Sequence, residues 1–280
     1  MQKLDGQLIT VLGGGGFLGR YVVQRLLARG ARVRVAQREP RAATFLKPLG
    51  GLGQTQFVAC DVRDPASVAR AVQGSDAVIN LAGAFADMQA VQADGAGHVA
   101  AAAKAAGARA LVHVSAIGAD PESASAYGRS KGDGEAAVRA AFADAAILRP
   151  SILFGREDHF INRFATMMRL SPVVPVIAPD AKFQPAYVGD VADAVVAALG
   201  SDAASKTYEL GGPQVLTMGE LLRWIADATG RSPLFVDVPD VVAWAVIKAF
   251  LAVVTRYGFA PFAWYRIIVG IAALIWLGMR

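Results

Sequence analysis

A glycine-rich turn is the first feature of this sequence whose residues could do chemistry. The run from Thr10 to Arg20 reads Thr-Val-Leu-Gly-Gly-Gly-Gly-Phe-Leu-Gly-Arg and joins an apolar stretch to an amphipathic one. Gly13 would permit a tight turn, Gly16 would let the backbone approach a pyrophosphate, and Gly19 would let a helix pack closely on a strand. The N-terminus of that helix would attract phosphate. The pattern predicts a dinucleotide site; the alternative is a purely structural turn.

The residues that follow these glycines by about 20 positions indicate which dinucleotide is preferred. Sites for NAD usually carry a carboxylate there, which bonds the ribose 2′-hydroxyl. Gln37 stands at this place, followed by Arg38, with Arg41 nearby. A missing carboxylate and an added guanidinium favour a 2′-phosphate, so we expect NADP(H) to be preferred over NAD(H). A solvated Arg38 without a ligand is the alternative.

Two further sets of residues end apolar runs that read as strands. Asp61 and Val62 close one run, where a carboxylate would meet an adenine amino group. Leu81, Ala82 and Gly83 close the next, where small residues would let a cofactor lie against the backbone. Each set taken alone is also compatible with an ordinary loop.

Tyr127 and Lys131 form the spacing that suits proton transfer. Four residues apart on a helix, the phenol and the ammonium would share one face. A cation beside Tyr127 would lower the pKa of its phenol, and the ammonium of Lys131 would also bond the nicotinamide ribose. The pair therefore predicts a catalytic acid and its partner, although chance also produces such spacings.

The elements that would position these residues alternate along the chain. Apolar runs predict strands and alanine-rich stretches predict helices, and their succession predicts right-handed crossovers and a doubly wound parallel sheet of the Rossmann type. We expect an α/β dinucleotide-binding domain over residues 1–150, a small α+β subdomain over 151–240 on the substrate side, and a hydrophobic helical tail over 241–280. The expected strands are 8–12, 32–37, 56–60, 77–81, 110–115, 146–148, 173–177 and 208–210, and the expected helices are 17–28, 65–72, 91–105, 134–141, 161–169, 191–198 and 218–228.

Composition excludes several classes of protein. With 280 residues, 54% hydrophobic and 18% charged, the chain is not intrinsically disordered. One cysteine, Cys60, and three histidines give no basis for a disulfide or a metal site, so we expect no metal. Four of the basic residues lie in the acid-free stretch 241–280, leaving 24 basic against 23 acidic groups elsewhere. A nearly neutral body is a poor polyanion binder, so we expect no nucleic-acid partner.

The tail has the composition of a membrane segment. Between Phe262 and Met279 the only charged residue is Arg266, and a span needs roughly 17–25 residues. Trp264 and Tyr265 beside that arginine resemble an interfacial anchor. Because the N-terminus shows no signal peptide, we expect the chain to lie at the cytoplasmic face of the inner (cytoplasmic) membrane. Two buried helices of a soluble domain are the alternative.

In the order of these motifs the chain resembles the short-chain dehydrogenase/reductase superfamily, in its extended or atypical branch of NAD-dependent epimerases and dehydratases. The resemblance covers roughly residues 7–238. It implies that Tyr127 and Lys131 are catalytic and also touch the cofactor, together with the glycine turn and with Phe17, Leu18, Val62, Pro150 and Ile152. Segments 16–23, 154–160, 185–190 and 208–213 are similar to the dehydrogenase-like accessory subunits of respiratory complex I and their bacterial relatives, which are tight NADPH binders without an established reaction.

Two departures from the family pattern affect this expectation. The serine or threonine that polarises the substrate carbonyl falls on Ile117, while Ser115 would lie beside the cofactor and is a doubtful third catalytic candidate. Loss of that donor removes a large electrostatic contribution, so we expect weak turnover or none. Residues 241–280 resemble the C-terminus of undecaprenyl-diphosphate phosphatases without their catalytic motifs, which implies membrane insertion, no phosphatase activity, and a gene fusion or frameshift near residue 240.

Three functions remain open. The main expectation is an NADP(H)-binding accessory or structural subunit, or assembly partner, of a quinone-linked respiratory complex. The second is an active reductase, epimerase or dehydratase acting on a sugar-nucleotide, isoprenoid or quinone-like substrate. The third is a membrane-tethered dinucleotide sensor. Residues 155–240, which would form the substrate pocket, show no cluster that names a substrate.

Overall fold

The structure is a computed structural model that describes residues 4–239, so the predicted tail at 241–280 lies outside the described residues. Internal contacts divide the described chain into two interleaved units. Residues 4–163 and 183–216 form the first, and residues 164–182 and 217–239 form the second. The domain boundaries expected near residues 150 and 240 stay a prediction.

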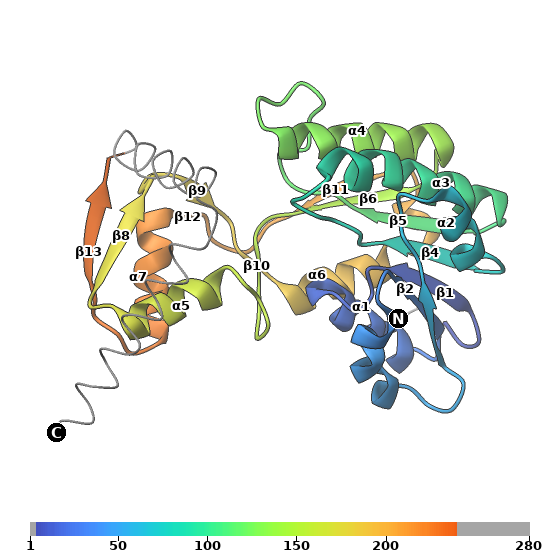
Figure 1. Cartoon of the computed structure of the whole chain (residues 1–280), viewed down its shortest axis with the longest axis horizontal. Helices are drawn as coiled ribbons and strands as arrows, with labels where there is room; N and C mark the ends of the chain where they lie inside the picture. Colours follow the sequence, from blue (N-terminus) through green and yellow to red (C-terminus); the bar gives the residue numbers. More distant parts are fainter. Residues whose placement is uncertain (1–3, 240–280) are drawn as a thin grey trace, which may run out of the picture. The chain divides into compact units, whose positions relative to one another are not determined.

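Seven parallel strands form the sheet of the first unit, in the order β11-β6-β5-β4-β1-β2-β3 (Figure 1). The strand order reverses beside β1, where Val11 pairs with Val35 on one side and with Ile79 on the other. This confirms the predicted Rossmann-like α/β sheet. The strands are β1 (Leu8–Leu12), β2 (Arg32–Gln37), β3 (Thr55–Ala59), β4 (Ala77–Asn80), β5 (Ala110–Val114), β6 (Ala146–Pro150) and β11 (Thr207–Leu210).

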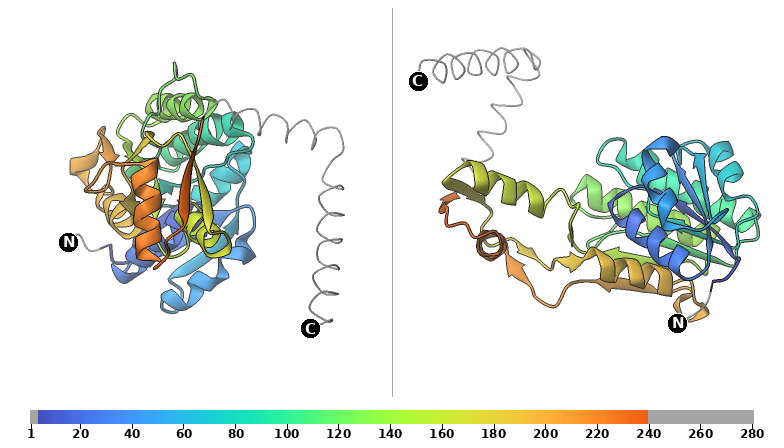
Figure 2. Two further views of the ribbon diagram at one scale, coloured as in Figure 1. Left: turned by 90° about the vertical axis from the view of Figure 1, so that its left-hand side faces the viewer. Right: turned by 90° about the horizontal axis from the view of Figure 1, so that it is seen from below.

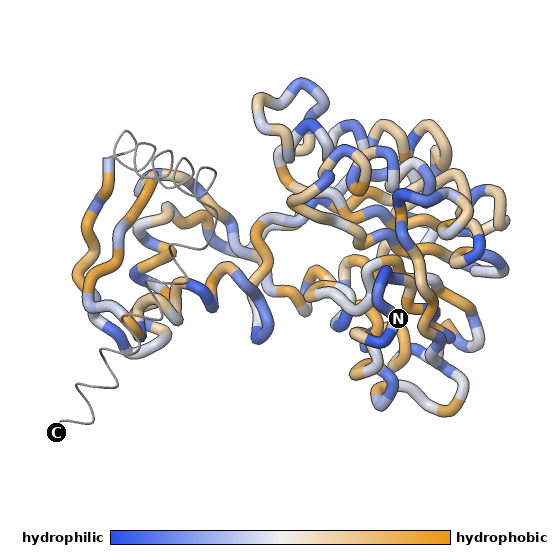
Figure 3. Tube along the Cα trace, viewed as in Figure 1, coloured by the Kyte–Doolittle hydropathy of each residue, from blue (hydrophilic) through white to orange (hydrophobic). Residues whose placement is uncertain are grey.

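Helices cover both faces of this sheet, as Figures 1 and 2 show from three directions. On one face α1 (Phe17–Ala28) and α6 (Val188–Ala197) pack on strand residues such as Ile9, and on the other α2 (Pro65–Val72), α3 (Gly95–Ala105) and α4 (Ala126–Ala141) pack on residues such as Leu12. Side chains on both faces of β1, β4, β5 and β6 are buried, so these strands read as apolar runs. Figure 3 shows the hydropathy along the chain.

Two helices differ from the sequence expectation. The helix expected over 134–141 begins at Ala126, and the helix expected over 91–105 is a π-helical segment, η2 (Gln89–Asp94), followed by α3. Glycines lower helix propensity, which hides the first half of α4 in the sequence. Packing requires a glycine there, since a Cβ at Gly132 would overlap the backbone of Pro121.

The remaining elements are short. Within the second unit β8 and β13 pair in parallel, with Leu234 opposite Val173, and α7 begins with a capping box formed by Thr217 and Glu220. No helix described between residues 4 and 239 is long and apolar enough to cross a membrane. The other elements are η1 (Pro40–Leu49), β7 (Leu153–Phe154), α5 (Ile161–Leu170), β8 (Val173–Ile177), β9 (Lys182–Phe183), β10 (Ala186–Tyr187), η3 (Ser201–Ala203), β12 (Leu216–Thr217), α7 (Met218–Ala228) and β13 (Leu234–Val238).

Candidate functional site

A cleft of about 650 Å³ opens at the carboxyl ends of β1, β2, β3 and β4. Ligands of open α/β sheets bind in the crevice where the strand order reverses, which is the position of this cleft. Its lining brings together residues from four separate chain segments. Among them are eight of the predicted cofactor residues: Gly13, Gly16, Arg38, Asp61, Val62, Leu81, Ala82 and Gly83.

The glycine turn between β1 and α1 has the close approaches that its sequence predicts. Gly13 has a φ of +78°, and a Cβ there would lie 3.2 Å from the backbone carbonyl of Leu81. Gly16 caps the N-terminus of α1, and a Cβ there would touch only the carbonyl oxygen of Gly13, at 3.2 Å. A Cβ at Gly19 would instead overlap the backbone of the turn itself. The backbone at Gly16 is therefore the part of the turn left open for a ligand.

The end of the cleft at β2 and β3 is charged. Arg38 follows β2 directly, and Asp61 follows β3 after Cys60. Arg63 pairs with Asp61 at 2.7 Å, and its side-chain and backbone hydrogen bonds to this carboxylate lower the pKa of Asp61 to about 2. Arg38 lies near enough to lower that pKa further. The lining of the cleft thus holds two guanidinium groups, of Arg38 and Arg63, and three carboxylates, of Glu39, Asp61 and Asp87. Arg63 pairs with both aspartates, which leaves Arg38 as the guanidinium that a phosphorylated ligand would meet there.

Tyr127 and Lys131 both lie on α4, and Lys131 adjoins the cleft. A Cβ built at Gly83 would lie 3.8 Å from Nζ of Lys131, which donates to the carbonyl oxygen of Val114 at 3.5 Å. Lys131 is only 5% exposed, and this burial lowers its pKa to about 8, while the negative charge of Glu135 opposes the shift. The protonated and neutral forms are therefore both accessible near neutral pH.

The pKa of Tyr127 moves in the direction opposite to the sequence expectation. Burial raises it, whereas a neighbouring cation was expected to lower it. Nζ of Lys131 lies 5.9 Å from the centre of the tyrosine ring, and the ring of Phe85 stacks on it at 5.6 Å. Burial is the cause of this shift, so the phenol of Tyr127 is protonated near neutral pH.

Ser115 and Ile117, which follow β5, differ in their exposure to solvent. Ser115 is 3% exposed, and its hydroxyl has no hydrogen-bond partner among the described residues. Ile117 is 41% exposed, and its backbone N–H donates to the carbonyl oxygen of Pro150 at 3.1 Å. The exposed position after this strand thus holds an apolar side chain. That Ile117 stands in place of a carbonyl-polarising hydroxyl stays a prediction.

Several predicted cofactor residues do not line the cleft. Phe17 and Leu18 lie in the first turn of α1, and the ring of Phe17 packs edge-on against Tyr21 at 6.1 Å. Pro150 ends β6, and the carbonyl oxygen of Ile152 accepts a hydrogen bond from the backbone N–H of Ala186 at 2.9 Å. Their contact with a cofactor stays a prediction.

Three features of the site are absent from the sequence expectation. The arginine–aspartate pair of Arg63 and Asp61 has a sequence signal, since the two charges stand two residues apart. The exposed ring of Phe85 has no sequence signal, because a phenylalanine in a loop is ordinarily predicted to be buried in the hydrophobic core. Glu135 also has no sequence signal. The guanidinium of Arg149 donates two hydrogen bonds to its carboxylate, at 2.9 and 2.8 Å.

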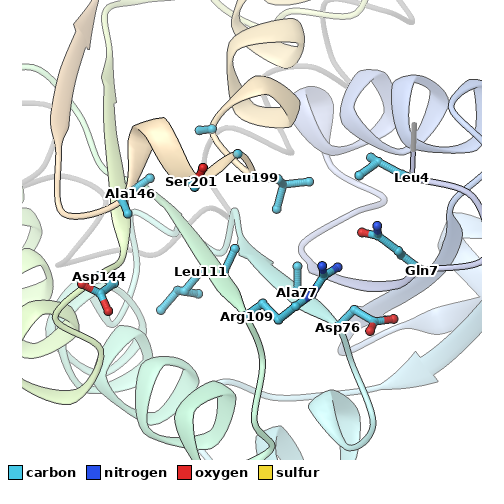
Figure 4. Close-up of a pocket in the computed structure, with 14 residues that line it drawn as sticks. Leu4, Gln7, Asp76, Ala77, Arg109, Leu111, Asp144, Ala146, Leu199 and Ser201 are labelled. Carbon is cyan, nitrogen blue, oxygen red and sulfur yellow. The ribbon is translucent and has the colours of Figure 1, made fainter. Parts of the chain in front are cut away.

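A second, smaller cavity of about 230 Å³ lies at the amino ends of the strands (Figure 4). Asp76 and Arg109 precede β4 and β5 there, and Asp76 accepts a hydrogen bond from the backbone N–H of Leu8 at 2.7 Å. It contains none of the predicted site residues. Among residues 4–239 no group of three or more His, Cys, Asp or Glu side chains is arranged to hold a metal ion.

Comparison with known proteins gives one family match and several similar chains. Residues 9–211 match the family described as NAD dependent epimerase/dehydratase. The chain is 39% identical over 250 residues to "NADH dehydrogenase [ubiquinone] 1 alpha subcomplex subunit 9, mitochondrial" of Mus musculus, covering 84% of this chain and 66% of that protein. It is also 32% identical over 256 residues to "Ceramide reductase" of Caulobacter vibrioides, covering 87% of this chain and 78% of that protein.

Two of the matches cover only part of the related protein. The chain spans slightly less than two thirds of the mouse subunit. A separate match, 50% identical over 85 residues, is to "Undecaprenyl-diphosphatase" of Rhizorhabdus wittichii and covers 28% of this chain and 32% of that protein. The predicted resemblance to such phosphatases is thus confirmed for a partial segment.

Among solved structures, similarity extends to the fold alone. The Bordetella bronchiseptica enzyme WbmG in complex with NAD has a TM-score of 0.72 at 19% identity, covering 84% of this chain and 82% of that one. The dTDP-4-dehydrorhamnose reductase of Bacillus anthracis in complex with NADP has a TM-score of 0.70 at 19% identity, covering 83% and 84%.

Proposed function

The chain belongs to the NAD dependent epimerase/dehydratase family, and from that premise we propose that it binds NADP(H) in the cleft at the carboxyl ends of β1–β4. The open backbone at Gly16 supports this proposal, because a pyrophosphate needs such an approach at a helix N-terminus. The adenosine end would lie toward β2 and β3, and the nicotinamide end toward Gly83 and Lys131.

The preference for NADP(H) over NAD(H) rests on the charges at the end of β2. Arg38 lines the cleft, and the preceding residue, Gln37, is a neutral amide. A ribose 2′-phosphate would gain a charge-assisted bond from Arg38 there. Glu39, which follows Arg38 and also lines the cleft, is the carboxylate that would oppose it. Asp61 does not oppose this, because Arg63 is bound to it.

We propose further that the chain serves as an accessory subunit or assembly partner of a quinone-linked respiratory complex resembling complex I. The observation that carries this proposal is the 39% identity to subunit 9 of mitochondrial NADH dehydrogenase [ubiquinone] over 84% of this chain. The isoleucine at position 117 agrees with a bound cofactor that is held rather than turned over.

Mass identification of the co-purifying nucleotide tests the cofactor part of this proposal. The full-length chain, purified without added nucleotide and denatured, is expected to release NADP⁺ or NADPH. Release of NAD(H) alone would contradict the preference, and absence of any dinucleotide, together with no binding of added NADPH, would contradict the cofactor site itself.

An active reductase is the second candidate, and a specific observation favours it. Tyr127 carries its proton and lies on the same helix as Lys131, whose Nζ adjoins the cleft beside Gly83. Such a phenol could protonate a carbonyl oxygen while a reduced nicotinamide delivers hydride to the carbonyl carbon. The similarity to the Caulobacter ceramide reductase supports this candidate. Steady-state turnover with a panel of carbonyl substrates separates it from the accessory subunit.

Attachment to the cytoplasmic face of the inner membrane is proposed from the sequence of residues 241–280 alone. The run from Phe262 to Met279 is apolar enough to insert, because its Leu, Ile, Phe and Val residues each contribute about −0.3 to −0.6 kcal/mol. The full chain should sediment with membranes and resist carbonate extraction, whereas a chain ending at Pro239 should be soluble and bind NADPH. Recovery of the full chain in the soluble fraction without detergent would contradict membrane attachment.

A further inference from the structure

The residues beside Tyr127 form an apolar surface at the carboxyl ends of two adjacent strands. Phe85 follows β4 and is 86% exposed, although its ring stacks on Tyr127 at 5.6 Å with an interplanar angle of 23°. Ile117 follows β5 and is 41% exposed. Because β4 and β5 pair in parallel, these two loops leave the same edge of the sheet. We call the surface formed by Phe85, Tyr127 and Ile117 the aromatic face.

The loops that carry the aromatic face contain little charge. Residues 83–87 read Gly-Ala-Phe-Ala-Asp and residues 115–119 read Ser-Ala-Ile-Gly-Ala, with Asp87 as the one charged residue. That carboxylate is paired with Arg63 at 3.3 Å. These loops offer no cation to a phosphate and few donors to a sugar hydroxyl. An exposed phenylalanine stacked on a tyrosine instead offers area to an apolar ligand.

The loop after β4 also connects the aromatic face to the cofactor cleft. Gly83, Ala84, Ala86 and Asp87 line the cleft, whereas Phe85 turns its ring to Tyr127. A ligand resting on Phe85 would therefore lie beside the cleft and near the ring of Tyr127. The raised pKa of Tyr127 agrees with a water-poor surface, and a protonated phenol there donates a hydrogen bond to a carbonyl oxygen.

We propose that the aromatic face binds an apolar carbonyl compound, such as a quinone or a long-chain ketone, rather than a sugar-nucleotide. This inference rests on the proposed cofactor site and narrows the class of ligand that lies beside it. Binding requires no turnover, so it applies to an accessory subunit and to a reductase alike. Stacking and burial on Phe85 supply affinity, and the Tyr127 hydroxyl supplies the contact that favours a carbonyl group.

The test uses the full-length chain in mild detergent, loaded with NADP⁺ so that no hydride is available. Isothermal titration calorimetry with a quinone bearing an alkyl tail, with a long-chain 2-alkanone and with UDP-glucose measures binding in the unmodified chain, in Phe85→Ser and in Leu52→Ser. Leu52 is a fully exposed leucine outside this face, so its variant controls for loss of a surface apolar group. NADP⁺ affinity is measured first in every variant.

At least one apolar carbonyl compound should bind, about tenfold or more weakly in Phe85→Ser and unchanged in Leu52→Ser, and UDP-glucose should not bind. Whichever of the two apolar compounds binds identifies the ligand class as a quinone or a long-chain ketone. Three results, each with NADP⁺ binding retained, would overturn the inference. They are that neither apolar compound binds, that an apolar compound binds Phe85→Ser as tightly as the unmodified chain, or that UDP-glucose binds more tightly than the apolar compounds. Loss of co-purification with the respiratory complex in Phe85→Ser at unchanged ligand affinity would also overturn it, since Phe85 would then dock a protein. Absence of NADP⁺ binding in the unmodified chain overturns the proposed function instead.

Discussion

The side-chain oxygen of Gln37 accepts a hydrogen bond from the backbone N–H of Gly15 at 2.9 Å. Its side-chain nitrogen donates to the carbonyl oxygen of Glu39 at 2.7 Å. Both ends of this amide are therefore engaged by the chain itself, and the last residue of β2 presents no negative charge to a ribose. The next residue, Arg38, lines the cleft with a positive charge, whereas Arg63, the other arginine of the lining, is paired with Asp61 and Asp87.

The first prediction is that the chain binds NADPH more tightly than NADH. Arg38→Asp should erase or reverse this preference, because each lost charge-assisted bond is worth about 1.5–3 kcal/mol, roughly a 10- to 100-fold change in affinity. Calorimetry with both cofactors measures the ratio, and Arg32→Asp, at the exposed far end of the same strand, is the control. Equal affinities in the unmodified protein would show that Arg38 is only solvated.

Gly16→Val should abolish nucleotide binding and leave the fold largely intact. The new side chain would fill the space of the pyrophosphate, while its Cβ meets only the carbonyl oxygen of Gly13 at 3.2 Å. Gly51→Val is the matched control, because Gly51 lies in an exposed loop outside the cleft and near only the side chain of Gln54. Circular dichroism checks the fold and fluorescence titration checks binding. If Gly16→Val still retains its nucleotide, the glycine turn is only structural.

Turnover of carbonyl substrates should be weak or absent in the unmodified chain, because the side chain of Ile117 has no hydrogen-bond donor for a substrate carbonyl. Ile117→Ser should raise kcat by up to about 100-fold if a substrate is bound, since one such donor is worth roughly that factor. Ile117→Val is the control that shortens the side chain without adding a donor. Brisk turnover in the unmodified chain that disappears in Tyr127→Phe would refute this prediction and favour the reductase.

The affinity for NADPH should fall as pH rises through the pKa of Lys131. Burial holds that pKa at about 8, so the ammonium that would bond the nicotinamide ribose is present below this pH and lost above it. Fluorescence titrations from about pH 6.5 to about pH 9.5 measure the change. Lys131→Met should bind more weakly with a flat profile over this range, whereas Lys104→Met, an exposed lysine on α3, should keep the profile. A profile unaltered by Lys131→Met would exclude this lysine from the ribose contact.

Much of the fold could be predicted because its strands are apolar on both faces. Residues such as Ile9 and Leu12 face opposite cores, so β1 reads as a continuous apolar run and its end is visible at Gly13. The eight predicted residues that line the cleft follow from this, since parallel strands place their carboxyl ends at one edge. The start of α4 at Ala126 is not among the expected helix bounds, although the spacing of Tyr127 and Lys131 assumes a helix there. Gly128 and Gly132 lower the helix propensity of this half, and the packing that requires Gly132, against the backbone of Pro121, is not visible in the sequence.

The chemistry of the tyrosine could not be predicted from helix spacing. The interval between Tyr127 and Lys131 places both on one face of a helix, but it carries no information on which loops cover that face. Phe85 approaches from the end of β4, and burial then raises the pKa of Tyr127 where the lysine alone would lower it. Burial in the tertiary structure thus sets the direction of the pKa shift of Tyr127, which the spacing to Lys131 alone predicts to be opposite.

Native separation of mildly solubilised membranes, followed by mass spectrometry of the band that holds the quinone-linked respiratory complex, is the most direct test of the proposed role. This chain is expected in that band together with NADP(H), and Gly16→Val is expected to lose the nucleotide. Migration of the chain apart from every subunit of the complex, or its presence there with NAD(H) alone, would contradict the proposal of an NADP(H)-binding accessory subunit.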